Sequence, residues 1–244
     1  PRPHDPITPP SNAMAEAIDY SPQGITDKFA VNPMVNIWKF DNKWMATTDQ
    51  NLFVEFDPVT LKTASGGVAN GAWDPNDPIT KKGVMGIGVA HGRFDRWTKE
   101  HFWLEIDMGM VIGKAKYNIW TYKEDGKQHS TTLPSRRILG TFEDDKTSFV
   151  HSFALTDHYI IVIQCPMHYS FLKFMTAKEV IDTISWDSTT PVKFHVMNRT
   201  SGKVIKTITD QSAWFVYHIA NAYETTNSEG KDLVHIDFSK YNND

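Results

Sequence analysis

WFVYHIANAYE, residues 214–224, places a histidine, His218, inside a run of aromatic and small apolar residues. Such a run is typical of a buried strand that leads into a turn. A buried imidazole needs either hydrogen-bond partners or a metal ion. The choice between these two roles governs how the rest of the sequence is interpreted.

Strand-like runs of the same kind recur along the chain from Val35 onward. They include VNIWKF, HFWLEIDM, YIIVIQ and VKFHVMNR, and turn-forming segments such as FDNK, EDGK and RTSGK separate them. Many short strands with such turns predict an all-β fold, and repeated up-down hairpins favour the blades of a β-propeller over a barrel or a sandwich. VKFHVMNRTSGKVIKTIT, residues 192–209, predicts a hairpin with TSG at its tip. Helix is predicted only for TAKEVIDTISW, residues 176–186.

Composition excludes several classes of function. The chain has 244 residues and a formal net charge of −4, which argues against a nucleic-acid partner. The single cysteine, Cys165, allows neither an internal disulfide nor a cysteine-based zinc site. No apolar run approaches the roughly 20 residues of a membrane span, and plastid and cytoplasm both remain open as locations.

The N-terminal region differs from the rest of the chain. Residues 1–12 contain five of the 13 prolines. Because proline stiffens the chain and removes backbone donors, we expect residues 1–30 to form an extended arm and residues 31–244 to form the folded domain.

The ten histidines fall into groups by their surroundings. Those in polar segments are expected to be solvated, and those in strands with neighbouring charges are expected to be surface or hydrogen-bonded core residues. The first group is His4 and His129, and the second is His101, His195 and His235. His158 lies in the turn LTDH, and the role of His168 is open.

The remaining three, His91, His151 and His218, interrupt apolar strand ends and lie far apart in the sequence. They are either three unrelated buried imidazoles or three ligands that converge on one transition metal. Imidazole suits iron, zinc, copper and nickel alike, and the spacing matches no local zinc motif.

At these residues the sequence resembles the carotenoid cleavage oxygenase family. The similar blocks are NPMVNIWKFDNKWMATTDQNLFVEFDPVTLKT, GVAHGRFD, SFVHSFALTDHYIIVIQCP, VKFHVMNRTSG and WFVYHIANAYE, which come in the family's order within residues 31–241. The most specific parts are FVHSFALTDHYIIV and YHIANAYE.

The resemblance implies a seven-bladed β-propeller with Fe(2+) on its axis, held by four histidines. By position, His91, His151 and His218 would be the first three ligands, and Asp49 would stand where the family has a glutamate that hydrogen-bonds an iron-bound imidazole. For Asp49 a turn-capping role in DQN is the alternative. The implied substrates are O2 and a carotenoid or apocarotenoid, whose carbon–carbon double bond is cleaved to carbonyl products.

The resemblance is incomplete. The family's fourth histidine lies further along than Asp244, and His235 does not match its position, so we expect only a partial set of propeller blades here. The alternative to an oxygenase is therefore a non-catalytic subunit or scaffold, with an incomplete iron site, in a larger protein complex such as a pigment-bearing one.

Contact with a membrane surface is a further expectation, because carotenoids partition into membranes. Within MHYSFLKFMTAKEVIDTISW, residues 167–186, the apolar Phe171, Leu172, Phe174 and Met175 lie next to Lys173 and Lys178. An exposed cluster of this composition can enter a bilayer interface, and an ordinary packed helix and loop is the alternative.

Overall fold

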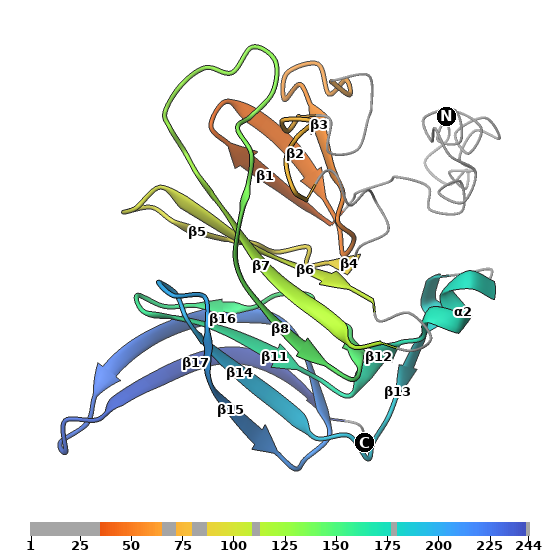
Figure 1. Ribbon diagram of the computed structural model, residues 1–244, viewed down its shortest axis with the longest axis vertical. Helices are drawn as coiled ribbons and strands as arrows, with labels where there is room; N and C mark the ends of the chain where they lie inside the picture. The colour runs from red at the N-terminus through yellow and green to blue at the C-terminus, as the bar shows by residue number, and fades with distance from the viewer. Residues whose placement is uncertain (1–34, 65–71, 80–86, 109–112, 177–179, 243–244) are drawn as a thin grey trace, which may run out of the picture.

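The computed structural model describes residues 35–64, 72–79, 87–108, 113–176 and 180–242, and these are built mainly from antiparallel strands (Figure 1). The predicted all-β class is thereby confirmed. The extended arm expected at residues 1–30 lies outside the described residues. No helix in the described part of the chain combines the length and hydropathy of a membrane span.

The first sheet contains β1 (Asn36–Phe40), β2 (Lys43–Thr47) and β3 (Phe53–Phe56), in that order. The turn between β1 and β2 is tight, and Asp41 adopts a positive φ of 49° there. Aspartate is one of the few non-glycine residues that enter this region readily. The sheet buries Phe40, Met45 and Phe53 on one face.

The second sheet is the most deeply buried. It contains β4 (Ile87–Gly88), β5 (Arg93–Asp95), β6 (Glu100–Asp107), β7 (Ala115–Lys123) and β8 (Arg137–Asp144). Strands β6 and β7 form its centre and are buried along almost their whole length, because both of their faces are covered.

A third sheet has the order β10 (Ala154–Leu155), β11 (Tyr159–Gln164), β14 (Val192–Asn198) and β15 (Val204–Asp210). The predicted hairpin at residues 192–209 is confirmed by the pairing of β14 with β15. A small sheet beside it contains β9 (Thr147–Ser148), β12 (Met167–Tyr169) and β13 (Ile184–Trp186).

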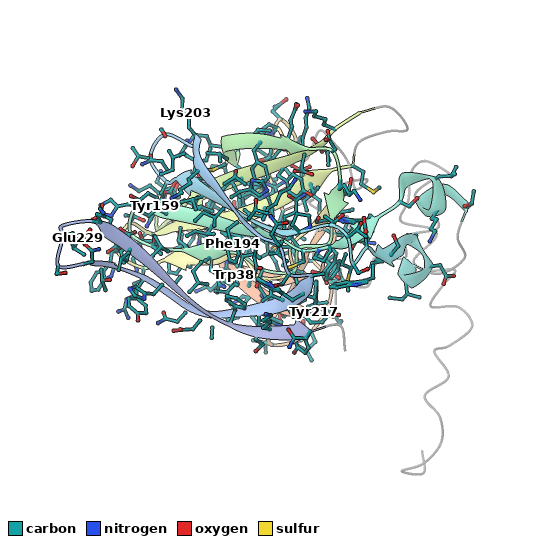
Figure 2. The ribbon with its side chains drawn as sticks, turned by 90° about the horizontal axis from the view of Figure 1, so that it is seen from below. Trp38, Tyr159, Phe194, Lys203, Tyr217 and Glu229 are labelled. Carbon is teal, nitrogen blue, oxygen red and sulfur yellow. The ribbon has the colours of Figure 1, made fainter. Side chains whose placement is uncertain are left out.

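The last two strands form a long ribbon of their own. Strand β16 (Trp214–Thr226) pairs with β17 (Asp232–Asn242), and Figure 2 shows Glu229 at the turn of this ribbon with Tyr217 toward its other end. The pairing is irregular between Val216 and Ile219 and again between Ile219 and Asn221. Bulges of this kind bend a strand and redirect its side chains.

Two apolar clusters hold these sheets together. The larger joins the first and second sheets and is rich in aromatic rings, including Trp103, Trp120 and Phe53. The smaller packs the β16–β17 ribbon against the third sheet through Trp214, Phe215 and Ile163. The first sheet, the second sheet and the final ribbon follow one another along the chain, as the blades of a propeller do, whereas the strands of the third sheet and of the small sheet beside it alternate in sequence.

The helix prediction for residues 176–186 is largely wrong. The described residues instead contain a short helix α2 (Phe171–Thr176), a 3-10 turn (Val180–Thr183) and strand β13. The alternation of Ile184 and Trp186 around Ser185 suits the pairing of β13 with β12, and that pairing overrides the weak helical pattern.

Candidate metal centre

His91 lies in the short connection between β4 and β5, and the first sheet holds this connection in place. The carbonyl of Ala90 accepts hydrogen bonds from Asn36 Nδ2 at 3.2 Å and from Thr47 Oγ1 at 3.1 Å. The Ala90 N–H donates to Asp49 Oδ1 at 3.2 Å. With both polar groups of the preceding residue bound, the position of His91 is set by contacts outside its own segment.

Gly92 allows the chain to pass close to an indole directly after His91. A Cβ at residue 92 would lie 2.0 Å from the Trp103 ring, which is far inside van der Waals contact. Trp103 is itself fixed, because its Nε1–H donates to the Val89 carbonyl at 2.8 Å. Glycine is therefore the residue that fits here.

His151 lies between β9 and β10, beside the His91 segment. The His91 N–H donates to the His151 carbonyl at 3.3 Å, and residues 91 and 152 form a parallel bridge. The His151 Nδ1 lies 2.8 Å from Asp49 Oδ1 and 3.0 Å from Oδ2. A carboxylate at Nδ1 favours the tautomer with the proton on Nδ1, so the Nε2 lone pair is left available.

His218 lies within β16, in the first irregularity of its pairing with β17, between Val216 and Ile219. The strand leads into a turn after Thr226, as the sequence predicted, but the His218 side chain is exposed, so the prediction of a buried imidazole at this position is wrong. Ser152 ties β16 to the His151 segment, because its Oγ donates to the Tyr217 carbonyl at 2.6 Å and accepts from the Ile219 N–H at 3.2 Å.

The structure brings the three histidines together. One ring nitrogen of each lies within 4.8 Å of the corresponding atoms of the other two. The ring centroids of His91 and His151 are 4.7 Å apart, and each lies 5.0 Å from that of His218. The rings are steeply inclined to one another, with interplanar angles of 67° to 78°.

This donor set fits a transition metal. A metal–nitrogen bond of about 2 Å puts each ring centroid a little over 3 Å from a shared ion, so the centroids are expected to lie about 4.5–5 Å apart. The observed triangle has those dimensions. The Asp49 contact is of the kind that orients metal-bound imidazoles.

Electrostatics keep one of the imidazoles neutral. Burial, followed by the neighbouring His151 and His218, lowers the pKa of His91 to about 4. His91 therefore carries a free lone pair at neutral pH, as a metal ligand must.

Aromatic rings cover one side of the cluster. Tyr217 meets the His151 ring edge-on at 5.3 Å between centroids, and Phe149 stacks on it at 6.2 Å. Phe149 also packs against Tyr169, and burial raises the pKa of that phenol above its usual range. These rings limit the access of water from their side.

The histidines expected to be core residues do have hydrogen-bond partners. His101 contacts Trp38 and Glu124, His195 contacts Gln164 and Thr207, and His235 contacts Thr225. His168, whose role was open, is buried against Ser148.

His129, which was predicted to be solvated, instead lies partly buried beside Asp41 and Asp125. These three residues form the other group within the described residues whose atoms are close enough for a metal. Their oxygens and ring nitrogen are already engaged in contacts with Tyr122, Gly126 and one another.

Two residues of the site were not singled out from the sequence, namely Ser152 and Arg93. Ser152 follows directly after His151, and Arg93 comes two residues after His91. A polar residue within two positions of a histidine in an apolar segment is the signal that could have identified both.

Comparison with known proteins shows the family. The model of the retinal pigment epithelial membrane protein family matches residues 7–244. Among curated proteins, β,β-carotene 15,15'-dioxygenase of Gallus gallus is 27% identical over 93% of this chain and 42% of the relative. The carotenoid isomerooxygenase of Drosophila melanogaster is 24% identical over 79% of this chain and 29% of the relative.

Solved structures share the fold. The lignostilbene dioxygenase of Pseudomonas brassicacearum matches with a TM-score of 0.63 at 19% identity, over 86% of this chain and 38% of that one. A mutant of the Synechocystis apocarotenoid oxygenase matches with a TM-score of 0.59 at 18% identity, over 87% of this chain and 42% of that one. The fold is accordingly part of a β-propeller, as predicted.

This chain spans about two fifths of the length of the vertebrate carotene dioxygenases that it matches. The matched range, residues 7–244, includes all three clustered histidines, and the similar curated proteins include a β,β-carotene 15,15'-dioxygenase and a carotenoid isomerooxygenase. The chain belongs to the retinal pigment epithelial membrane protein family.

Proposed function

We propose that this chain contributes an iron site to an oxygenase that cleaves a carbon–carbon double bond of a carotenoid or apocarotenoid. His91, His151 and His218 would hold the ion. Bound Fe(II) would supply the activation of O2 for that cleavage. The observation that carries the proposal is the convergence of three imidazole nitrogens, within 4.8 Å of one another, from three distant parts of the chain.

The chain's own residues would perform three tasks around the ion. Asp49 accepts the His151 Nδ1–H and so directs the other ring nitrogen into the cluster. Burial keeps His91 neutral. Phe149, Tyr169 and Tyr217 form an apolar wall that would exclude water and offer flat surface to a polyene.

Relatives support the choice of substrate class. Their names specify β,β-carotene 15,15'-dioxygenase, carotenoid isomerooxygenase and carotenoid-cleaving dioxygenase. Contact with a membrane surface is part of the proposal, because Leu172 of α2 and Ile181 of the following turn are 69% and 72% exposed. For the other apolar residues expected there, Phe171, Phe174 and Met175, the structure describes the helical backbone but not the side chains.

Metal analysis tests the proposal. The protein is loaded with Fe(II) without oxygen, separated from free metal and analysed, and about one iron per chain is expected. His151→Ala should abolish binding. His195→Gln is a matched control, because His151 and His195 are 7% and 6% exposed but His195 lies outside the cluster. Incubation of loaded protein with a carotenoid and O2 should then release aldehydes.

Two results would contradict the proposal. Wild-type protein that takes up no iron would contradict the metal site. A His151→Ala variant that binds iron as well as the wild type does would contradict it too. Iron-free protein that forms a stable complex with other subunits would instead favour a non-catalytic scaffold in a larger protein complex.

A further inference from the structure

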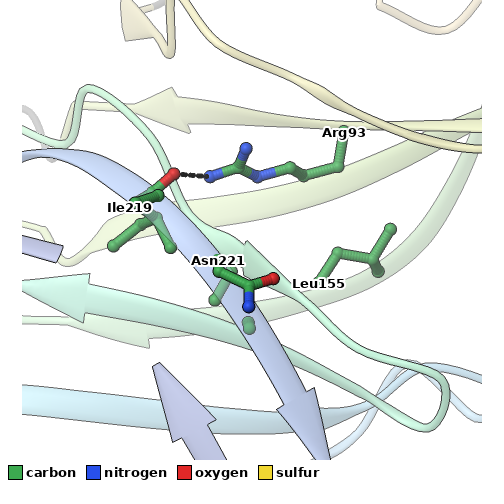
Figure 3. Close-up of a pocket in the computed structure, with 7 residues that line it drawn as sticks. Arg93, Leu155, Ile219 and Asn221 are labelled. Atoms are coloured by element: carbon green, nitrogen blue, oxygen red, sulfur yellow. Dashed lines mark hydrogen bonds between the residues drawn. The ribbon is translucent and has the colours of Figure 1, made fainter. Parts of the chain in front are cut away.

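Arg93 projects from β5 into the junction of the three histidine-bearing segments. Its Nε–H donates to the Phe153 carbonyl at 2.6 Å, and its Nη2–H donates to the Ile219 carbonyl at 3.1 Å. Figure 3 shows the second of these bonds, with the guanidinium reaching across to β16. One side chain therefore contacts two segments that come from different sheets.

The positions of these partners follow a pattern. Arg93 is two residues after His91, Phe153 is two residues after His151, and Ile219 directly follows His218. Each segment that carries a histidine thus provides either the guanidinium or one of the carbonyls that it binds. A planar group with several fixed donors is suited to bind two carbonyls at once.

The two carbonyls belong to buried residues. Phe153 is 0% exposed and Ile219 is 6% exposed. A buried carbonyl that loses its donor costs free energy, so truncation of Arg93 would force both segments to move or to admit water. A cavity of about 150 Å³ lies beside the guanidinium and is lined by Leu155, Asn221 and their neighbours. The cavity gives water and backbone room to rearrange.

We propose that Arg93 is a positioning residue that fixes the His91, His151 and His218 segments in the arrangement that binds metal. It contacts none of the three imidazoles through a hydrogen bond, and it acts through the backbone carbonyls of Phe153 and Ile219. The inference rests on the proposed function for its consequence, metal affinity, but the fixing of the three segments stands on these contacts alone.

Two variants and one control test this role. Arg93→Met removes both donated bonds and keeps much of the apolar stem. Arg93→Lys keeps the charge and can donate to one carbonyl at a time. Arg199→Met is the matched control, because Arg199 is also partly buried and binds the Thr156 carbonyl and Asp95, but its side chain donates to neither Phe153 nor β16.

The first measurement is amide hydrogen exchange in metal-free protein. The N–H groups of His91 and Ile219 are each hydrogen-bonded across the junction. We expect Arg93→Met to speed their exchange by about tenfold or more relative to amides in the centre of β7, with little change in Arg199→Met. Unchanged exchange at both amides in a folded Arg93→Met protein would overturn the inference.

The second measurement is affinity for Co²⁺, followed by its visible absorption. We expect Arg93→Met to weaken binding by about 10- to 100-fold and Arg93→Lys to recover part of the loss. An equal loss in Arg199→Met would show that general stability, and not Arg93, sets the affinity.

Failure of the two proposals is distinguishable. Wild-type protein that binds no Co²⁺ would contradict the proposed function, and the exchange measurement would still decide the role of Arg93. Wild-type protein that binds Co²⁺, together with an Arg93→Met variant that binds it equally well and shows the same spectrum, would contradict the positioning role alone.

Discussion

At the scale of single residues, the contacts of Asp49 distinguish between its two expected roles. Its carboxylate does not serve only its own turn, because it accepts from the Ala90 N–H and contacts His151 Nδ1. The shorter aspartate reaches the imidazole directly at 2.8 Å. The family resemblance led us to expect a hydrogen bond from Asp49 to one of the imidazoles, without saying which. The contact with Ala90 depends on how the first two sheets pack, which no local pattern encodes.

Replacing Asp49 with alanine should weaken metal binding. Loss of the carboxylate frees the His151 ring to rotate and lowers its basicity, so affinity for Co²⁺ should fall by about 10- to 100-fold. Asp125→Ala is the control, since Asp125 also contacts a histidine, His129, outside the cluster. Equal affinities in wild type and Asp49→Ala would contradict an orienting role.

Replacing Gly92 with alanine should destabilise the fold. The added methyl group meets the buried Trp103 ring, and relief requires movement of packed groups at a cost of about 1–3 kcal/mol. The midpoint and slope of urea unfolding measure the loss. Gly126→Ala is the control for adding a methyl group to a glycine without a steric clash. Residue 126 has a positive φ of 71°, but a Cβ there would have no neighbour within 4 Å. Its loss should stay near the smaller backbone penalty.

At the scale of elements, strands were easier to predict than helices or than the bulges within strands. The alternating and aromatic runs predicted β6, β7, β11 and the β14–β15 hairpin, because their side chains suit a covered sheet. The bulges around His218 could not be predicted. They arise from the register of β16 against β17, which depends on both strands together.

Two buried strand histidines should make stability depend on pH. Burial lowers the pKa of His168 on β12 and of His195 on β14 to about 4. Between the ordinary value of 6.5 and about 4, the unfolded chain therefore binds more protons than the folded one. Their contribution is fully present above about pH 6.5 and is lost as the pH falls toward 4, by about 1.4 kcal/mol per pH unit for each histidine.

Urea unfolding at pH 7.5, 6 and 5 measures this slope. The double variant His168→Gln, His195→Gln should unfold with a much weaker pH dependence than wild type, even if it is less stable at pH 7.5. A double variant whose stability falls with the same slope as wild type would show that other groups govern acid sensitivity.

At the scale of the whole molecule, Tyr117 ties separate sheets together. Its hydroxyl donates to the Lys146 carbonyl at 2.8 Å and accepts from the Ser148 N–H at 2.8 Å and from Gln164 Nε2 at 3.0 Å. These partners lie on or next to β9 and on β11, whereas Tyr117 is on β7. The sequence predicted propeller blades from their strands, but not the contacts between blades.

Replacing Tyr117 with phenylalanine should therefore reduce stability more than the loss of one hydroxyl group suggests. The change leaves the Ser148 N–H and the Gln164 amide without this partner in a buried site, at a cost of about 1–3 kcal/mol. Tyr223→Phe is the control, because Tyr223 is 45% exposed. Thermal or urea unfolding measures both, and equal losses would contradict a tie between sheets.

The register of β16 against β17 has a consequence for how the cluster can be lost. Deleting one residue between Trp214 and His218 would shift the imidazole to the opposite side of the ribbon while the remaining ladder re-forms. A single in-frame deletion of one codon could thus abolish ion binding and spare the scaffold.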